Sequence, residues 1–121
     1  MKYIPRAITP ILEKRVETSK CTLLTGARQV GKSTVIKETF PAYTIASFDD
    51  VLTRLQAHEE PKLFFLNKPC PLFIDEVQKE PGILENIKLI VDNSDERGQF
   101  ILSGSSKLQL MKGVSESLAG R

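Results

Sequence analysis

The amino-acid sequence predicts an α/β protein, a three-layer α/β/α domain built on a parallel sheet. Short apolar segments alternate with helical segments along the 121 residues, which is the pattern of βαβ units. Polar residues, several of them acidic, follow the predicted strands directly. Because helix-covered parallel sheets bind ligands outside the carboxyl ends of their strands, these polar residues indicate a candidate site.

Prolines mark several of the element boundaries. Thr9 and Pro10 would start the first helix as its N-cap and first helical residue. Pro41 ends the second helix, and Pro61 interrupts the helical stretch after it. In chain order we expect a helix from Thr9, a strand over 21–25, a helix over 32–39, a strand over 43–48, a broken helix over 51–66, a strand over 72–74, a helix from Pro81 and a strand over 99–102.

The helix after Pro81 has the clearest periodicity in the chain. Its apolar residues recur at helical spacing and would share one face directed at the core. They are Ile83, Leu84, Ile87, Ile90 and Val91.

Composition describes a globular protein and excludes several function classes. Hydrophobic residues make up 40% and charged residues 26% of the chain, as in folded domains. The net charge of +2 is spread along the chain, so no basic block indicates nucleic acid. The longest apolar run, residues 63–66, is too short to span a membrane. We therefore expect one cytoplasmic domain over residues 1–121, without a signal peptide.

Two cysteines, Cys21 and Cys70, are too few for a disulfide scaffold and match no metal-ligand spacing. We expect both to be small core residues of a reduced protein.

A glycine-rich stretch, G-A-R-Q-V-G-K-S at residues 26–33, fits the phosphate-binding pattern G-x-x-x-x-G-K-[ST]. Its glycines let successive backbone N–H groups turn towards an anion, and the following helix directs its positive dipole end to the same point. We expect Lys32 to neutralise the outer phosphates and Ser33 to bind Mg²⁺. The predicted phosphate contacts are Gly26, Ala27, Arg28, Gln29, Val30, Gly31, Lys32, Ser33 and Thr34.

A second stretch, P-L-F-I-D-E at residues 71–76, is an apolar strand that ends in two carboxylates. Asp75 would hold Mg²⁺ directly or through water, and Glu76 would take a proton from an attacking water, so that Lys32 and Glu76 are the predicted catalytic residues. Asp75 is followed by E-V-Q, not by the x-x-G of a GTPase, and the chain has no N-K-x-D. ATP is therefore favoured over GTP, and a small-molecule kinase is a less favoured alternative.

Other polar residues follow the strands at the same predicted edge. Ser103 and Ser105 are candidates for sensing the γ-phosphate, with Ser105 slightly favoured, although either serine could cap a following helix instead. Asp49 and Asp50 are better explained as helix N-caps than as ligands. Gln78, like Lys79, lies near the carboxylates, with no chemistry assigned to it.

With L-L-T-G-A-R-Q-V-G-K-S-T, L-F-I-D-E-V-Q-K-E-P and S-E-S-L-A-G-R in place, nearly the whole chain resembles the N-terminal ATPase core of prokaryotic AAA+-like ATPases that usually carry a domain of unknown function behind the core. The resemblance implies a P-loop NTPase fold with strand order 5-1-4-3-2, Mg²⁺ as cofactor, and ATP or ADP as ligand. It assigns phosphate binding to residues 26–34, the acidic motif to Asp75 and Glu76, and the sensing position to Ser105 or Ser103.

The resemblance also implies parts that this chain does not contain. Family members continue beyond L-A-G-R, so the domain is expected to be truncated at Arg121, without the fifth strand, any lid or the C-terminal domain. Assembly through the ATP site could make Arg121 an arginine finger in a homo-oligomer, but we expect no such role for the last residue. A Mg²⁺-dependent ATPase is the leading interpretation. A nucleotide-binding switch without significant turnover is the alternative.

The strand order makes one prediction about the cysteines. Strand 4 would separate the strands next to Cys21 and Cys70 by two spacings, roughly 9–10 Å, which is too far for a disulfide.

Overall fold

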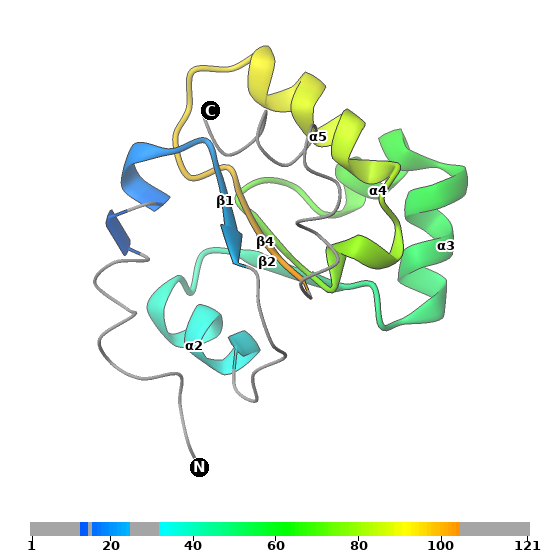
Figure 1. Cartoon of the computed structure of the whole chain (residues 1–121), viewed down its shortest axis with the longest axis horizontal. Helices are drawn as coiled ribbons and strands as arrows, with labels where there is room; N and C mark the ends of the chain where they lie inside the picture. Colours follow the sequence, from blue (N-terminus) through cyan, green and yellow to red (C-terminus); the bar gives the residue numbers. More distant parts are fainter. Residues whose placement is uncertain (1–12, 15, 25–31, 105–121) are drawn as a thin grey trace.

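The computed structural model describes residues 13–14, 16–24 and 32–104, with the backbone alone over 32–35. Residues 13–14 and 16–18 are helical. The elements that follow are β1 (Cys21–Leu24), α2 (Lys32–Thr39), β2 (Thr44–Ser47), α3 (Val51–Glu59), α4 (Pro61–Asn67), β3 (Leu72–Asp75), the 3-10 helix η1 (Val77–Lys79), α5 (Ile83–Asp92) and β4 (Phe100–Ser103) (Figure 1).

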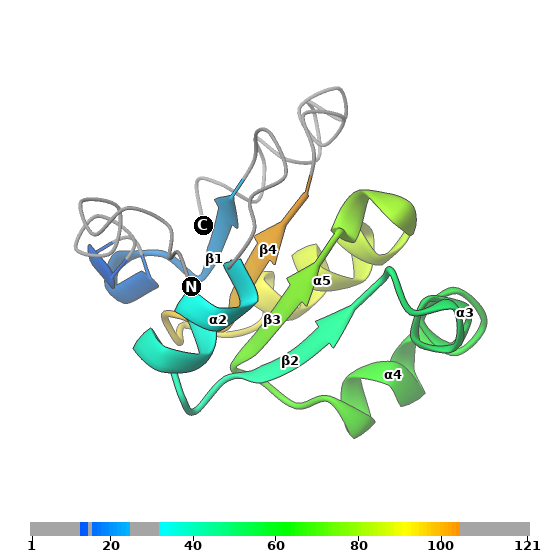
Figure 2. The ribbon, with the colours of Figure 1, turned by 90° about the horizontal axis from the view of Figure 1, so that it is seen from below.

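The four strands form one parallel sheet in the order β1-β4-β3-β2 (Figure 2). One row of the register runs across all of it, from Thr22 through Ile101 and Phe73 to Ile45. This order is the 1-4-3-2 part of the order that the resemblance implies, so that prediction is confirmed for the strands described.

Helices cover both faces of this sheet. In Figure 2, α2 lies in front of the strands and α5 behind them. A large apolar cluster fills the face covered by α3, α4 and α5, and a second cluster around Phe73 and Ile101 packs against Ile36 of α2 and Val16. The three-layer α/β/α expectation is therefore confirmed.

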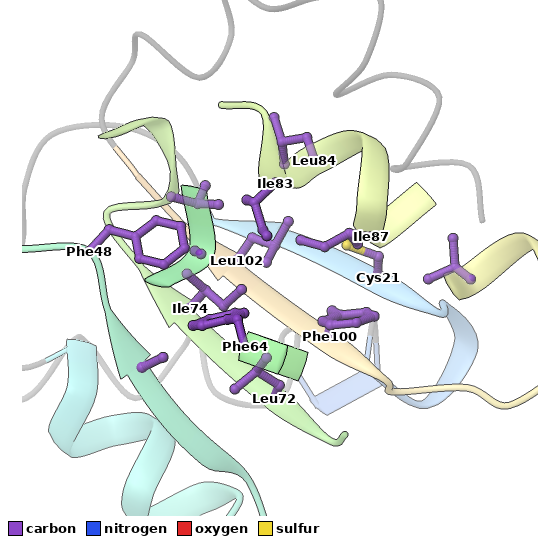
Figure 3. Close-up of a cluster of buried hydrophobic side chains, with 14 residues drawn as sticks. Cys21, Phe48, Phe64, Leu72, Ile74, Ile83, Leu84, Ile87, Phe100 and Leu102 are labelled. Atoms are coloured by element: carbon purple, nitrogen blue, oxygen red, sulfur yellow. The ribbon is translucent and has the colours of Figure 1, made fainter. Parts of the chain in front are cut away.

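Aromatic rings tie the larger cluster together (Figure 3). The rings of Phe48 and Phe64 lie 5.8 Å apart, and those of Phe65 and Phe100 lie 6.0 Å apart. Phe64 of α4 and Phe100 of β4 are fully buried. Pairs at such distances add about 0.5–1.5 kcal/mol beyond the burial of their area, so α4 is anchored firmly under the sheet.

Helix α5 begins at Ile83 rather than at Pro81. Pro81 and Gly82 form a turn, in which the backbone N–H of Leu84 donates to the Pro81 carbonyl at 3.1 Å. The predicted apolar face is otherwise confirmed, because four of its five residues are buried and Ile90 packs against them. No helix within the described ranges is long and apolar enough to cross a membrane.

The two cysteines have different environments. Cys21 is buried at the start of β1, as expected, but Cys70 is exposed, so the prediction of a core residue is wrong there. Cys70 precedes Pro71 in the connection from α4 to β3, outside the apolar clusters. Both thiols are free, and β4 lies between β1 and β3, as the strand order required.

Candidate functional site

The carboxyl ends of the four strands form one continuous edge. Leu24, the last residue of β1, pairs with Ser103 of β4, and Ser47 of β2 pairs with Asp75 of β3. The backbone N–H of Gly104 donates to the Leu24 carbonyl at 3.0 Å, which holds the residue after β4 next to the end of β1. The edge therefore places the entry to the glycine-rich segment, Ser103 and Asp75 on three neighbouring strands.

Asp75 and Ser103 are joined by a hydrogen bond. The Ser103 hydroxyl donates to Asp75 Oδ1 at 2.6 Å. Ser103 is fully buried, whereas Asp75 is half-buried at the edge of the sheet. A hydroxyl bound to a carboxylate makes a short, strong hydrogen bond, so Ser103 fixes the direction in which the Asp75 carboxylate points.

Glu76 follows Asp75 with an unusual backbone. Its φ of 55° and ψ of 45° lie in the left-handed region, which costs a side-chain-bearing residue about 1–2 kcal/mol. Its side chain is buried, with a residue exposure of 7%, and the amide of Gln78 donates to Glu76 Oε1 at 2.8 Å. Strained residues of this kind are concentrated at functional sites, so the backbone itself marks Glu76.

The segment after Glu76 is tied to the end of β2 and to α3. Lys79 Nζ donates to Asp49 Oδ1 just beyond β2, and the two groups also form an ion pair. His58 Nδ1 of α3 lies 3.1 Å from Glu80 Oε2. These contacts join the C-terminal end of η1 and the residue after it to the segment after β2 and to α3.

Helix capping accounts for one of the two aspartates after β2. Asp50 is the N-cap of α3, and its carboxylate accepts from the Thr53 N–H at 3.0 Å and from the Thr53 hydroxyl at 2.6 Å. These hydrogen bonds lower the pKa of the Asp50 carboxyl. The capping prediction is confirmed for Asp50, while Asp49 pairs with Lys79.

The structure describes part of the predicted site. It brings Asp75, Glu76 and Ser103 together at one edge. Lys32, Ser33 and Thr34 form the start of α2, where only the backbone is described. The predictions for residues 26–31, Ser105 and Arg121 lie outside the described residues.

Oxygen ligands suited to Mg²⁺ occur at this edge. Mg²⁺ in nucleotide sites is commonly bound through one or two carboxylates together with phosphates and water, and the fixed Asp75 carboxylate has that chemistry. Among residues 13–14, 16–24 and 32–104 there is no group of three or more histidine, cysteine, aspartate or glutamate residues able to hold a metal ion. The donor set at Asp75 therefore fits a cation that the phosphates help to bind.

Sequence reasoning missed two features of the site. It assigned no contact to Gln78, which the structure joins to Glu76, and it did not anticipate the left-handed backbone of Glu76. The spacing of Gln78 two residues after Glu76 was visible in the sequence, whereas no residue type indicated the backbone, because left-handed positions usually carry glycine, asparagine or aspartate.

Comparison with known proteins found one family model and two relatives that match most of the chain. A family model described as an AAA domain matches residues 18–121. Two relatives, uncharacterized protein Rv2008c of Mycobacterium tuberculosis and uncharacterized protein Mb2031c of Mycobacterium bovis, are each 32% identical to the chain over 114 residues. These alignments cover 91% of this chain and 25% of each relative, so the chain spans about a quarter of the length of the curated relatives it matches.

Proposed function

Because the chain belongs to the AAA domain family of nucleotide-binding, ATPase-like domains, we propose that it binds ATP with Mg²⁺ at the carboxyl edge of the sheet and hydrolyses the γ-phosphate. The observation that supports this most directly is the bond from Ser103 to Asp75, next to the strand that leads into the G-x-x-x-x-G-K-[ST] segment. Ser103 lies on β4, next to the strand that leads into the predicted phosphate loop, and the Asp75 carboxylate that it orients lies one strand further, on β3.

Each predicted residue has a role in this proposal. The backbone of residues 26–31, the Lys32 ammonium and Thr34 bind the phosphates. Ser33 and Asp75 hold Mg²⁺, which supplies charge neutralisation at the phosphates. Glu76 accepts the proton of the attacking water.

Ser103, the last residue of β4, and Ser105 have the two remaining roles in this proposal. The Ser103 hydroxyl is committed to Asp75, which supports a role in orienting the metal ligand. Sensing of the γ-phosphate then falls to Ser105.

Thermal unfolding with and without Mg²⁺-ATP tests the binding half of the proposal. At about 100 times its Kd, a ligand adds roughly 2.7 kcal/mol of stability, which raises the melting temperature of a domain of this size by several degrees. We expect the wild type to shift and Lys32→Ala to shift far less at the same ATP concentration. Equal shifts for both proteins would remove the predicted loop from the binding site.

Phosphate release tests the hydrolysis half. Loss of a general base costs about 100-fold to 10,000-fold in rate, so Glu76→Gln should bind ATP as the wild type does and lose nearly all turnover. A nucleotide switch predicts that neither binding nor turnover changes in this variant. A small-molecule kinase predicts transfer of phosphate to an added acceptor and not to water.

A further inference from the structure

We propose that Gln78 is a positioning residue that orients the Glu76 carboxylate for proton abstraction, an inference that rests on the hydrolysis proposed above. Its amide nitrogen donates to Glu76 Oε1 at 2.8 Å. Glu76 is buried and Gln78 half-buried, so water competes weakly for this bond. A donor bound to one carboxylate oxygen restricts the rotation of the group and therefore narrows the directions in which the other oxygen can point.

The local backbone explains why the two side chains meet. Glu76 turns the chain through its left-handed conformation, and η1 starts immediately behind it. The backbone N–H of Lys79 donates to the Glu76 carbonyl at 3.1 Å, which closes the turn. Because the turn is tight, the side chain of Gln78 lies against that of Glu76.

The turn that presents Gln78 is held in place by its neighbours. Val77, on one side, is fully buried in the larger apolar cluster. Lys79, on the other side, is paired with Asp49. Gln78 therefore stands on a fixed support, as a group must if it is to orient another side chain.

Steady-state hydrolysis by Gln78→Met tests the proposal. Methionine has a similar length and no N–H donor, and an error of about 1 Å in the position of a reacting group can cost about 100-fold in rate. We expect kcat to fall about 10-fold to 100-fold, with KM for ATP within about 2-fold of the wild type. Gln56→Met, the same exchange at a half-buried position of α3, is the matched control and should keep the wild-type kcat.

Two further variants separate positioning from a loss of folding. Gln78→Glu keeps the shape but replaces the donor by a like charge beside Glu76, so its kcat should fall below that of Gln78→Met. In a Glu76→Gln background, Gln78→Met should change kcat less than 2-fold, because the base it acts through has been removed. A full additional loss in that background would overturn the proposal.

Thermal unfolding without nucleotide gives a readout that does not depend on turnover. In a cycle of Glu76→Ala and Gln78→Ala, the double variant should lose a few degrees less than the two single variants together, since both singles break the same bond. Additive losses would show that the bond does not form.

The outcomes also distinguish the two proposals. If Glu76→Gln is inactive but Gln78→Met retains full kcat, the positioning role fails and the proposed ATPase stands. If the wild type releases no phosphate, the ATPase fails, and the positioning role falls with it even where the unfolding cycle shows the bond.

Discussion

Within the part of the chain that the structure describes, one residue with a left-handed backbone lies at the amino edge of the sheet and one at its carboxyl edge, and the two residues differ in kind. At the amino edge it is Gly98, with a φ of 67°, and at the carboxyl edge it is Glu76, with a φ of 55°. Glycine adopts this conformation without a steric penalty, whereas glutamate does not. Gly98 therefore suits the backbone conformation at the amino edge, whereas the backbone conformation at the carboxyl edge is unfavourable for Glu76.

The surroundings of Gly98 show what its edge requires. Its N–H donates to the Ser19 carbonyl at 2.8 Å, and its own carbonyl accepts from the Tyr43 hydroxyl. A Cβ at this position would lie 3.1 Å from the Tyr43 oxygen and 3.2 Å from Val16 Cγ1. The role of Gly98 is thus to let three chain segments close together, and a side chain would obstruct it.

Backbone strain is therefore retained at Glu76, a position whose side chain makes a hydrogen bond. The Glu76 carboxylate accepts from the Gln78 amide, one residue after Asp75, so the turn after β3 has a side-chain contact that glycine would not supply. Substitution of Glu76 by glycine should therefore lower activity, and substitution of Gly98 by a residue with a side chain should lower stability.

The largest expected effect is on activity at the carboxyl edge. Glu76→Gly should lower kcat about 100-fold or more by removing the base. Relief of about 1–2 kcal/mol of backbone strain should largely offset the lost side-chain bond and the greater freedom of the unfolded chain. We therefore expect the free energy of unfolding in urea to change by less than about 1 kcal/mol. A loss above about 3 kcal/mol would mean that Glu76 is retained for folding.

The reverse exchange should act on stability alone. Gly98→Ala places a Cβ in a left-handed position against Val16 and Tyr43, and should destabilise the protein by about 1–3 kcal/mol. Urea unfolding measures the loss, and hydrolysis assayed well below the melting temperature should remain at the wild-type rate. Gly82→Ala is the control, because there a Cβ meets only the flexible end of the Glu80 side chain, at 3.2 Å, and φ is −60°.

Removing the Tyr43 hydroxyl should have a smaller effect at the same edge. Tyr43→Phe loses the bond to the Gly98 carbonyl and should cost about 0.5–1.5 kcal/mol. Burial raises the pKa of Tyr43 to about 12 from 10.0, so its contribution to stability is complete below pH 10 and is lost as the pH rises towards 12. An absorbance titration of the wild type should show tyrosinate forming near pH 12, and Tyr43→Phe should lack this phase. A phase near pH 12 that persists in the variant would belong to another residue.

The smallest effect concerns thiol reactivity and leaves stability unchanged. Cys70 lies exposed at the amino edge, whereas burial raises the pKa of Cys21 to about 12. A thiol reagent at pH 8 should label one cysteine in the native protein and both in denaturant. Partial desolvation by the surrounding chain, followed by the nearby Glu96 charge, also raises the pKa of the Cys70 thiol, so its labelling should be slower than that of a free thiol. Cys70→Ser should abolish the native labelling, and labelling that survives in this variant would place Cys21 within reach of solvent.

Much of the fold could be predicted because local signals and tertiary packing agree. The bounds predicted for α2 and the break at Pro61 are confirmed, since prolines act locally. Several strand ends differ from the prediction by one residue because pairing decides them. β4 includes Ser103, which pairs with Leu24, and it begins at Phe100, whose N–H donates to the Lys20 carbonyl.

The sequence indicated which residue types the candidate site would contain, but it did not indicate all the contacts that they make. The motif indicated Asp75 and Glu76 because carboxylates after a buried strand suit a metal and a base. The Gln78 bond depends on the left-handed turn and on the support that Asp49 gives Lys79, two features that arise only in the folded chain. The same limit applies to Cys70, whose exposure follows from the path between α4 and β3.

The strand order has a consequence for the sequence of events in folding. β2 pairs with the next strand in the chain, Thr44 opposite Leu72, whereas β1 pairs with β4, much later in the chain, Cys21 opposite Phe100. Closing the longer loop costs about 1 kcal/mol more in chain entropy and delays the contact. We expect amide protons of β2 and β3 to become protected before those of β1 during refolding. The glycine-rich segment follows β1 in the sequence, so the proposed phosphate-binding half of the site would be anchored last, after the strands that carry the proposed acidic half have paired.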